Sequence, residues 1–217
     1  SEIQMNFEEK VGKDLNYLVF YPKDIDKNKK NNIIFFMHGY GHSMHGISGI
    51  IEYLSKDNIY IFFNAPFKMN IGLNAEGYRW FEFPLNESEF KFSQEAISSS
   101  IKEILIEFKF NYEKIYIGGF SQGGMMSLHN NYNGMVEGLI ILSSRLVYSD
   151  KEFYLNNNTK IFMSHGSNDS VIPKEAANYS LNFLKDKGFN IEYKEFQIAH
   201  EISIEQMNEL NKWIDDE

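Results

Sequence analysis

Seven short runs of β-branched, aromatic and aliphatic residues are spaced along the whole chain. They restrict the folds that the chain can adopt. Several are apolar without interruption, which is typical of strands that are buried on both faces of a sheet. Segments with helical spacing lie between them. This alternation predicts an α/β fold, with a mostly parallel central sheet covered by helices on both faces. The predicted strands are residues 15–21, 33–38, 59–64, 114–118, 138–142, 160–165 and 191–198.

The predicted helices have recognisable faces and ends. Residues 92–110 place apolar side chains on one stripe, and Ser93 is suited to cap their N-terminus. Residues 173–187 open with proline and close before Gly188, as helices often do. Residues 202–214 are again amphipathic. The stripe of the first helix consists of Ile97, Ile101, Ile104, Leu105 and Phe108.

Length and composition narrow the class of protein further. The 217 residues contain no internal repeat and no long linker, so we expect one domain over residues 1–217 without a large separate cap domain. The absence of cysteine excludes disulfides, thiolate metal sites and a cysteine nucleophile. A formal net charge of -9 disfavours binding to nucleic acid or anionic lipid. With no signal peptide or membrane-spanning run in the sequence, we expect a cytoplasmic protein without stable membrane insertion.

The strongest local signal lies within residues 114–130. A predicted strand runs directly into Gly119-Phe-Ser121-Gln-Gly123, and a helical pattern follows. Glycine-rich turns before helices are common, and many serines merely cap them. A strand before and a helix after Gly-x-Ser-x-Gly instead favour a nucleophile elbow, in which a strained turn exposes the serine and the glycines avoid collisions. We therefore predict that Ser121 is a nucleophile.

A serine hydroxyl needs a neighbouring base, and where this turn carries a nucleophile the acid and then the histidine follow it along the chain. Three of the six histidines follow Ser121. His129 lies along the next helix and points away from the turn, and His165 is better suited to support a loop. His200 lies between the last predicted strand and the last helix, where such a sheet presents its site. His200 is the predicted base.

The predicted acid is Asp169, in another loop that follows a strand. Its competitors are less suitable, because Asp150 follows an irregular stretch and Asp186 lies near a helix C-terminus among lysines.

An oxyanion hole needs two N–H groups, one from the residue after the nucleophile and one from the loop after the third strand. The backbone groups of Gln122 and Tyr40 are the candidates. A metal site at His38, His42 and His45 is the disfavoured alternative, because a Gly-Tyr-Gly turn interrupts any helix there.

Together these motifs resemble the phospholipase/carboxylesterase family of α/β-hydrolases, which includes acyl-protein thioesterases. The resemblance covers about residues 15 to 214 and implies the α/β-hydrolase fold, with Ser121, Asp169 and His200 as a catalytic triad that cleaves carboxylic esters or thioesters. His42 departs from the family pattern, since it stands where an aspartate is usual. The matching segments are His38-Gly-Tyr-Gly41, Asn64-Ala-Pro66, Tyr78-Arg-Trp-Phe-Glu82, Gly119-Phe-Ser-Gln-Gly-Gly124, His165-Gly-Ser-Asn-Asp169 with Val171 and Pro173, and His200-Glu-Ile202.

Such chemistry requires no metal or organic cofactor, and the expected substrate is a small-molecule or lipid-like acyl ester or an acylated protein. Residues 67–92 are unusually apolar for a connection, so we predict that they wall an acyl site through Met69, Leu73, Trp80 and Phe81. The alternative is that these side chains simply pack a long connection. A lysophospholipase or peptidase on the same scaffold, or a non-catalytic binding protein, stays open as a rival function, and a homodimer stays open as the quaternary state.

Overall fold

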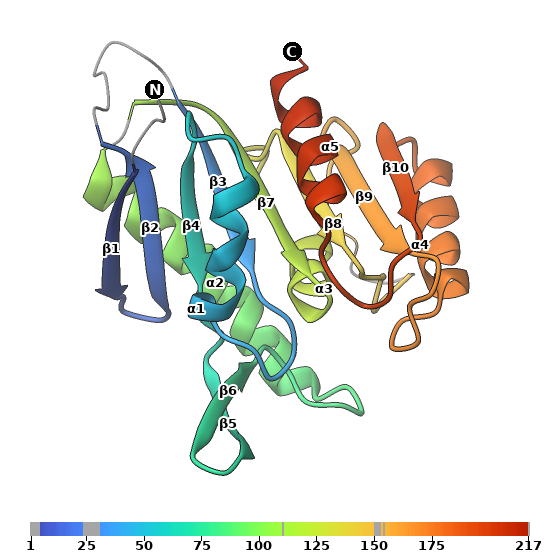
Figure 1. The fold of residues 1–217 in the computed structure, drawn as a ribbon, viewed down its shortest axis with the longest axis horizontal. Coiled ribbons are helices and arrows are strands. Elements are labelled where there is room, and N and C mark those ends of the chain that lie inside the picture. The colour runs from blue at the N-terminus through green and yellow to red at the C-terminus, as the bar shows by residue number, and fades with distance from the viewer. Residues whose placement is uncertain (1–4, 24–30, 110, 150–152, 154, 217) are drawn as a thin grey trace.

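An eight-stranded sheet in the order β1-β2-β4-β3-β7-β8-β9-β10 runs through the middle of the protein (Figure 1). The structure is a computed structural model that describes residues 5–23, 31–109, 111–149, 153 and 155–216. Strand β2 is antiparallel to both of its neighbours, and the other neighbouring strands are parallel. The strands of this sheet are β1 (Met5–Val11), β2 (Asn16–Pro22), β3 (Asn31–Met37), β4 (Ile59–Phe63), β7 (Tyr112–Phe120), β8 (Gly138–Leu142), β9 (Lys160–Gly166) and β10 (Ile191–Phe196).

Helices cover both faces of the sheet, as the sequence predicts. Buried side chains of α2, α3 and α4 belong to one hydrophobic core, and those of α1 and α5 belong to a second core on the other face. The 3-10 helix η1 packs its partly buried isoleucines against this second core. The helices are α1 (Met44–Ile47), η1 (Ser48–Tyr53), α2 (Glu87–Phe108), α3 (Gln122–Leu128), α4 (Lys174–Asp186) and α5 (Ile204–Asp215).

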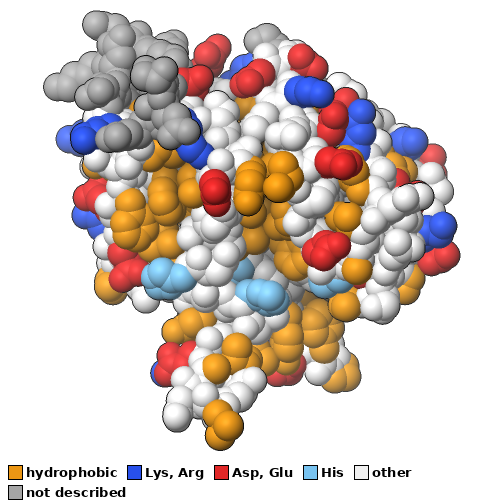
Figure 2. Space-filling view, in the orientation of Figure 1, with side chains coloured by type: hydrophobic (Ala, Val, Ile, Leu, Met, Phe, Trp, Pro, Cys, Tyr) orange, Lys and Arg blue, Asp and Glu red, His pale blue; other side chains and the backbone are white. Residues whose placement is uncertain are grey.

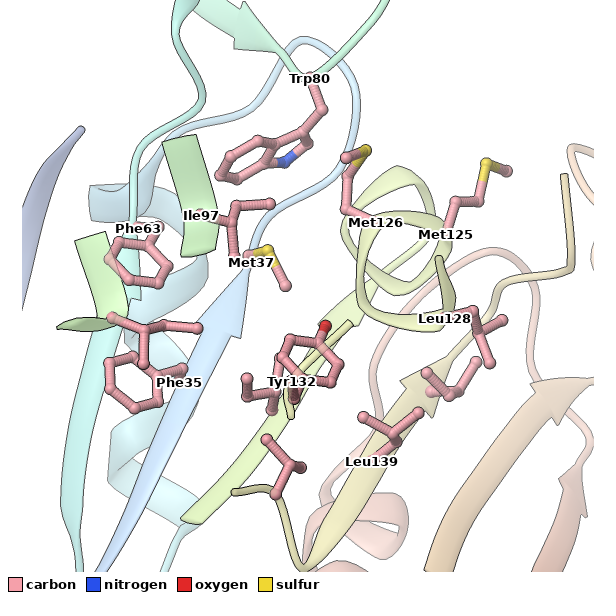
Figure 3. Close-up of a cluster of buried hydrophobic side chains, with 14 of the residues drawn as sticks. Phe35, Met37, Phe63, Trp80, Ile97, Met125, Met126, Leu128, Tyr132 and Leu139 are labelled. Carbon is pink, nitrogen blue, oxygen red and sulfur yellow. The ribbon is translucent and has the colours of Figure 1, made fainter. Parts of the chain in front are cut away.

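Strand β3 shows why the central strands contain continuous apolar runs, here residues 33–37. Ile33, Phe35 and Met37 point into the first core, whereas Ile34 and Phe36 point into the second. Successive side chains of a strand alternate between faces, so a strand covered on both sides needs an apolar residue at every position. Figure 3 shows the first core, with side chains of β3, β4, α2 and α3 packed beneath Trp80.

The elements that the sequence did not predict are those with mixed polarity. Strand β1 contains three consecutive charged residues, Glu8, Glu9 and Lys10, and lies at the edge of the sheet, where it is only partly buried. A second small sheet is formed by β5 (Phe67–Gly72) and β6 (Ala75–Arg79), an antiparallel hairpin that projects from the body (Figure 1). Residues 67–79 are therefore a hairpin rather than an irregular connection.

Helix α2 corrects the predicted N-terminus of the first long helix. It begins at Glu87 instead of residue 92, because the Asn86 side chain caps it by accepting the Glu89 N–H at 3.1 Å. Ser93 is not the cap. It is buried within the helix, and its hydroxyl donates to the Trp80 carbonyl at 2.6 Å.

The order of the strands determines where a site can form. After β3 the chain turns outward to β4, and it later returns on the other side of β3 as β7. This is a topological switch point, and open α/β sheets bind ligands beside the carboxyl ends of the strands at such points. Within the described residues, no helix combines the length and the apolar character needed to cross a membrane.

Candidate active site

Ser121 lies in a strained turn between β7 and α3. Its φ is +56° and its ψ is -116°, a conformation that costs a non-glycine residue roughly 1–3 kcal/mol. The turn needs glycine on both sides: a Cβ on Gly119 would lie 2.3 Å from the Gly123 carbonyl carbon, and one on Gly123 would lie 2.2 Å from the Met37 oxygen. The geometry is that of the predicted elbow.

The structure brings Ser121, His200 and Asp169 into one hydrogen-bonded chain. The Ser121 Oγ lies 3.0 Å from His200 Nε2, and His200 Nδ1 lies 2.7 Å from Asp169 Oδ2. The three residues follow β7, β9 and β10 at the same edge of the sheet. Such an arrangement can transfer the serine proton to the imidazole while the carboxylate stabilises the resulting cation.

The Asp169 side chain is completely buried and held from several directions. Its Oδ1 accepts the N–H groups of Val171 at 2.9 Å and Ile172 at 2.8 Å. His165 lies behind it, with Nε2 at 3.5 Å from Oδ2, and donates to the Ile172 carbonyl at 2.7 Å. His165 thus supports the acid loop, as its sequence position predicts.

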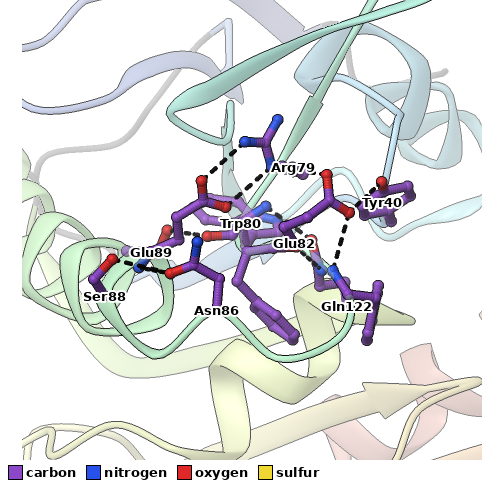
Figure 4. A network of polar contacts seen from close by, with 11 residues as sticks. Tyr40, Arg79, Trp80, Glu82, Asn86, Ser88, Glu89 and Gln122 are labelled. Carbon is purple, nitrogen blue, oxygen red and sulfur yellow. Dashed lines mark hydrogen bonds and ion pairs between the residues drawn. The ribbon is translucent and has the colours of Figure 1, made fainter.

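Tyr40 follows β3, the strand beside β7, and lines the same cavity as Ser121. Among the described residues, no acceptor takes up its backbone N–H. Its hydroxyl donates to Glu82 at 2.6 Å, and Glu82 also lies 3.5 Å from Arg79 Nε (Figure 4). The Tyr40 hydroxyl lowers the pKa of Glu82, which keeps that carboxylate ionised. This network ties the Tyr40 loop to the segment after β6.

Gln122 opens α3, so its backbone N–H lacks a partner within the helix. Its side chain is wholly buried between backbone groups (Figure 4). The Gln122 Oε1 accepts the Trp80 N–H at 2.8 Å, and its Nε2 donates to the Phe81 carbonyl at 2.7 Å. The amide therefore joins the elbow to the segment after β6.

This arrangement overturns the predicted role of Trp80 and Phe81 as an acyl wall. Both side chains are completely buried, and neither lines the cavity beside Ser121. The Trp80 indole instead donates to the His38 carbonyl at 2.8 Å, and the Phe81 ring packs against Phe90. They are part of the framework beneath the site.

The other two predicted substrate contacts also lie outside the cavity lining. Met69 is half-buried in β5, and Leu73, which is fully exposed, occupies the turn of the hairpin. Histidine side chains mark the surface where this hairpin meets the body (Figure 2).

The cavity beside Ser121 has a volume of about 460 Å³. Its apolar surface comes from residues next to the predicted motifs, so the rule that sites form at the carboxyl ends of strands could have found them. Only Phe83 comes from the connection that was expected to form the acyl wall. The lining residues are Gly39, Tyr40, His42, Phe83, Phe120, Ser121, Met125, Arg145, Val171, Ile172 and His200.

Two other histidines are buried in neutral form. His38 accepts the Ala65 N–H at 3.0 Å through Nε2, and burial lowers its pKa to about 4. Burial likewise lowers the pKa of His129 to about 4, and its Nε2 accepts the Val147 N–H at 2.8 Å. His129 therefore lies away from Ser121, as predicted. Asp150, a rejected acid, lies outside the described residues.

His45 pairs with Glu9 of β1. Over the part of the chain that the structure describes, no three His, Asp or Glu side chains form a group that could hold a metal ion.

Comparison with known proteins places this site in a family. The chain resembles Acyl-protein thioesterase 1 homolog 1 of Dictyostelium discoideum, with 31% identity over 202 residues that cover 83% of the chain and 88% of the relative. Acyl-protein thioesterase 1 of Kluyveromyces lactis is 29% identical over 210 residues, 84% of the chain and 90% of the relative.

Crystal structures of other proteins have a similar fold. A carboxylesterase from Mesorhizobium loti superposes with a TM-score of 0.79 at 14% identity, covering 98% of this chain and 100% of that one. The family model described as Phospholipase/Carboxylesterase matches residues 24–216. With that match over most of its length and an elbow serine at the switch point of an α/β-hydrolase sheet, the chain belongs to the phospholipase/carboxylesterase family.

Proposed function

We propose that this protein hydrolyses carboxylic esters or thioesters through an acyl-serine intermediate, with Ser121 as nucleophile, His200 as general base and Asp169 as the orienting acid. The observation that carries the proposal is the continuous hydrogen-bonded chain from the Ser121 Oγ to the Asp169 carboxylate, beside a cavity large enough for an acyl group. The names of the relatives, acyl-protein thioesterase and carboxylesterase, support this class of reaction.

In the acylation step, Ser121 Oγ attacks the acyl carbonyl carbon while His200 Nε2 accepts the hydroxyl proton. Asp169 stabilises the imidazolium because its Oδ2 accepts the His200 Nδ1–H. The carbonyl oxygen becomes an oxyanion, which the backbone N–H groups of Tyr40 and Gln122 stabilise. Each such donor contributes roughly 3 kcal/mol in the transition state.

The tetrahedral intermediate collapses when the leaving alcohol or thiol takes the proton from His200. A water molecule, activated by the same imidazole, then attacks the acyl-serine and releases the carboxylic acid. The fixed position of the imidazole between Ser121 and Asp169 suits both steps, because the group that accepts a proton in one donates it in the next.

The substrate contacts follow from the cavity lining. Phe83, Phe120, Met125, Val171 and Ile172 supply an apolar wall for the acyl chain. An ester of a small molecule or a lipid-like alcohol fits this lining, and an acylated protein fits it if only the acyl chain enters the cavity.

Replacement of the nucleophile tests the proposal. We expect Ser121→Ala to lower kcat/KM for 4-nitrophenyl butyrate by about 10⁴-fold or more, because the acyl-enzyme route is lost. Ser99→Ala is the control, since Ser99 is an exposed serine on α2 outside the cavity lining. Retention of wild-type kcat/KM by Ser121→Ala would contradict the proposal.

A further inference from the structure

The charges around the cavity differ in sign from those of the whole protein. The chain carries 30 acidic and 21 basic residues, a net charge of -9. The described residues that line the cavity include no carboxylate. They do include Arg145, His42 and His200. The neighbouring Asp169 is completely buried behind His200, and Glu82 is held by the Tyr40 hydroxyl and Arg79. A positive group thus borders the site of an acidic protein.

Arg145 has a free guanidinium at this border. The residue is exposed, and among the described residues its one hydrogen bond is from Nε to the neighbouring Leu146 carbonyl at 3.2 Å. No carboxylate among the described residues forms an ion pair with it, whereas Arg79 is paired with Glu89. Its terminal nitrogens are therefore available to a ligand in the fork geometry that matches carboxylate and phosphate.

The backbone that carries Arg145 is fixed relative to the nucleophile. The preceding residue, Ser144, donates its hydroxyl to the Ser121 carbonyl at 2.6 Å. The following residue, Leu146, donates its N–H to the Ser180 hydroxyl at 2.9 Å, and the Val147 N–H is bound by His129. These bonds fix the backbone position of Arg145 relative to Ser121, so only the arginine side chain itself has to become ordered when it binds a ligand.

We propose that Arg145 binds an anionic oxyacid group of the substrate, a carboxylate or a phosphate, and so selects negatively charged esters over neutral ones. This rests on the proposed ester hydrolysis and specifies its substrate class. The apolar lining contacts the hydrocarbon part of the substrate while Arg145 binds the charge at the cavity border. The charged group belongs either to the acyl chain, as in the monoester of a dicarboxylic acid, or to the leaving alcohol.

Matched ester pairs distinguish the two sources. The acyl-side pair is mono-4-nitrophenyl glutarate and its methyl-capped diester. The leaving-group pair is 4-(butyryloxy)benzoate and its methyl ester, with 4-(butyryloxy)phenyl phosphate as the phosphate form. For each pair the measured quantity is the ratio of kcat/KM for the charged ester to that for the neutral ester, which does not depend on how much of a variant is folded.

We expect wild-type protein to show a ratio of about 10 in at least one pair, equivalent to ~1.4 kcal/mol, at an ionic strength near 10 mM. Arg145→Met should bring that ratio close to 1, while Arg145→Lys should keep part of it because lysine retains the charge without the fork. The ratio of the wild type should also fall as salt is raised to about 500 mM, since screening shortens the range of the attraction.

Lys102→Met is the matched control, because it removes one exposed positive charge from α2 outside the cavity lining and should leave the ratio unchanged. A wild-type ratio near 1 in both pairs, with neutral esters hydrolysed normally, would overturn the selection of anions and leave the proposed hydrolysis intact. A high ratio that survives Arg145→Met would overturn the role of Arg145. Failure to hydrolyse any of the esters would instead contradict the proposed function itself.

Discussion

Ser121 illustrates how single residues at this site depend on their neighbours. Its positive φ is maintained because its N–H donates to the Leu142 carbonyl at 2.9 Å and its own carbonyl accepts the Gly124 and Met125 N–H groups. The strand, the helix and two glycines therefore hold one hydroxyl in a conformation that serine alone avoids. This local dependence is why the sequence around Ser121 is so informative.

We propose that Tyr40 contributes its side chain as well as its backbone N–H. Its hydroxyl bond to Glu82 and the contact of its ring with Phe83, at a centroid distance of 5.6 Å, hold the loop in which that N–H lies. We expect Tyr40→Phe to lower kcat for a neutral ester roughly tenfold, with a smaller change in KM, because misplacement of an oxyanion donor affects mainly the transition state.

Steady-state kinetics on 4-nitrophenyl butyrate measures this effect, and Glu82→Gln should act in the same direction because it weakens the same bond. Tyr179→Phe, which removes an exposed hydroxyl from α4, is the control. An unchanged kcat in Tyr40→Phe would show that the hydroxyl does not position the loop.

The residues that sequence could select are those whose role requires a fixed position after a strand. Ser121 follows β7 directly, and Asp169 and His200 lie in the loops after β9 and β10, so the serine motif and the chain order together could pick them out. Trp80 and Phe81 could not be assigned in this way, because an aromatic residue in a connection looks the same whether it faces a ligand or the core. The burial of both rings and the hydrogen bond from the Trp80 indole to the His38 carbonyl show that they face the core.

At the scale of elements, His129 joins the end of α3 to the segment that follows β8 and carries Arg145. Its Nε2 accepts the N–H groups of Val147 at 2.8 Å and Tyr148 at 3.3 Å, and aromatic rings surround the imidazole. Protonation would remove the acceptor, which agrees with a pKa lowered by burial to about 4. The hydrogen bonds between His129 and the segment after β8 are therefore sensitive to pH.

The direction of that sensitivity follows from linkage. The unfolded chain takes up a proton on each histidine near pH 6.5, but the folded chain does not protonate His129 or His38 until about pH 4. Their contribution to stability is therefore complete above pH 6.5 and is lost as the pH falls toward 4. When the pH falls from 7 to 5, we expect the titration of each of these two histidines to lower the free energy of unfolding by roughly 1–2 kcal/mol.

Urea unfolding of the wild type and His129→Gln at pH 7 and pH 5 measures the contribution of His129. Glutamine keeps an acceptor for the Val147 N–H but does not titrate, so the pH dependence of the variant should be smaller by roughly 1–2 kcal/mol. Equal pH dependence in the two proteins would contradict a neutral, buried His129.

Whether a strand or helix could be predicted from the sequence depended on its pattern of apolar residues and on its capping residues. The central strands were predictable because burial on both faces gives them continuous apolar runs, as in residues 33–37 of β3 and in β4 and β8. The edge strand β1 and the hairpin of β5 and β6 were not, since charged and polar residues interrupt their apolar residues. The Ser203 capping box of α5, with Gln206 at its third position, was readable from the sequence and would have placed the start of that helix.

At the scale of the whole molecule, the path of the chain through the sheet explains why the functional groups meet. Tyr40 and Ser121 follow neighbouring strands, β3 and β7, on either side of the switch point, and the loops after β9 and β10 supply Asp169 and His200. Residues far apart in sequence thus meet at one cavity, which Tyr40, Ser121 and His200 line and behind which Asp169 is buried. Of the described residues that line this cavity, Arg145 carries a charged side chain and none carries a carboxylate.

The proposed hydrolysis depends on the activation of Ser121 as a nucleophile by His200. Its most direct test is intact-protein mass spectrometry after reaction with a fluorophosphonate, followed by peptide mapping. We expect one adduct per chain, located on Ser121, absent in Ser121→Ala and formed much more slowly in His200→Ala, because the serine would then lack its base. An unmodified Ser121 in folded wild-type protein, or an adduct on another residue that persists in Ser121→Ala, would contradict the account.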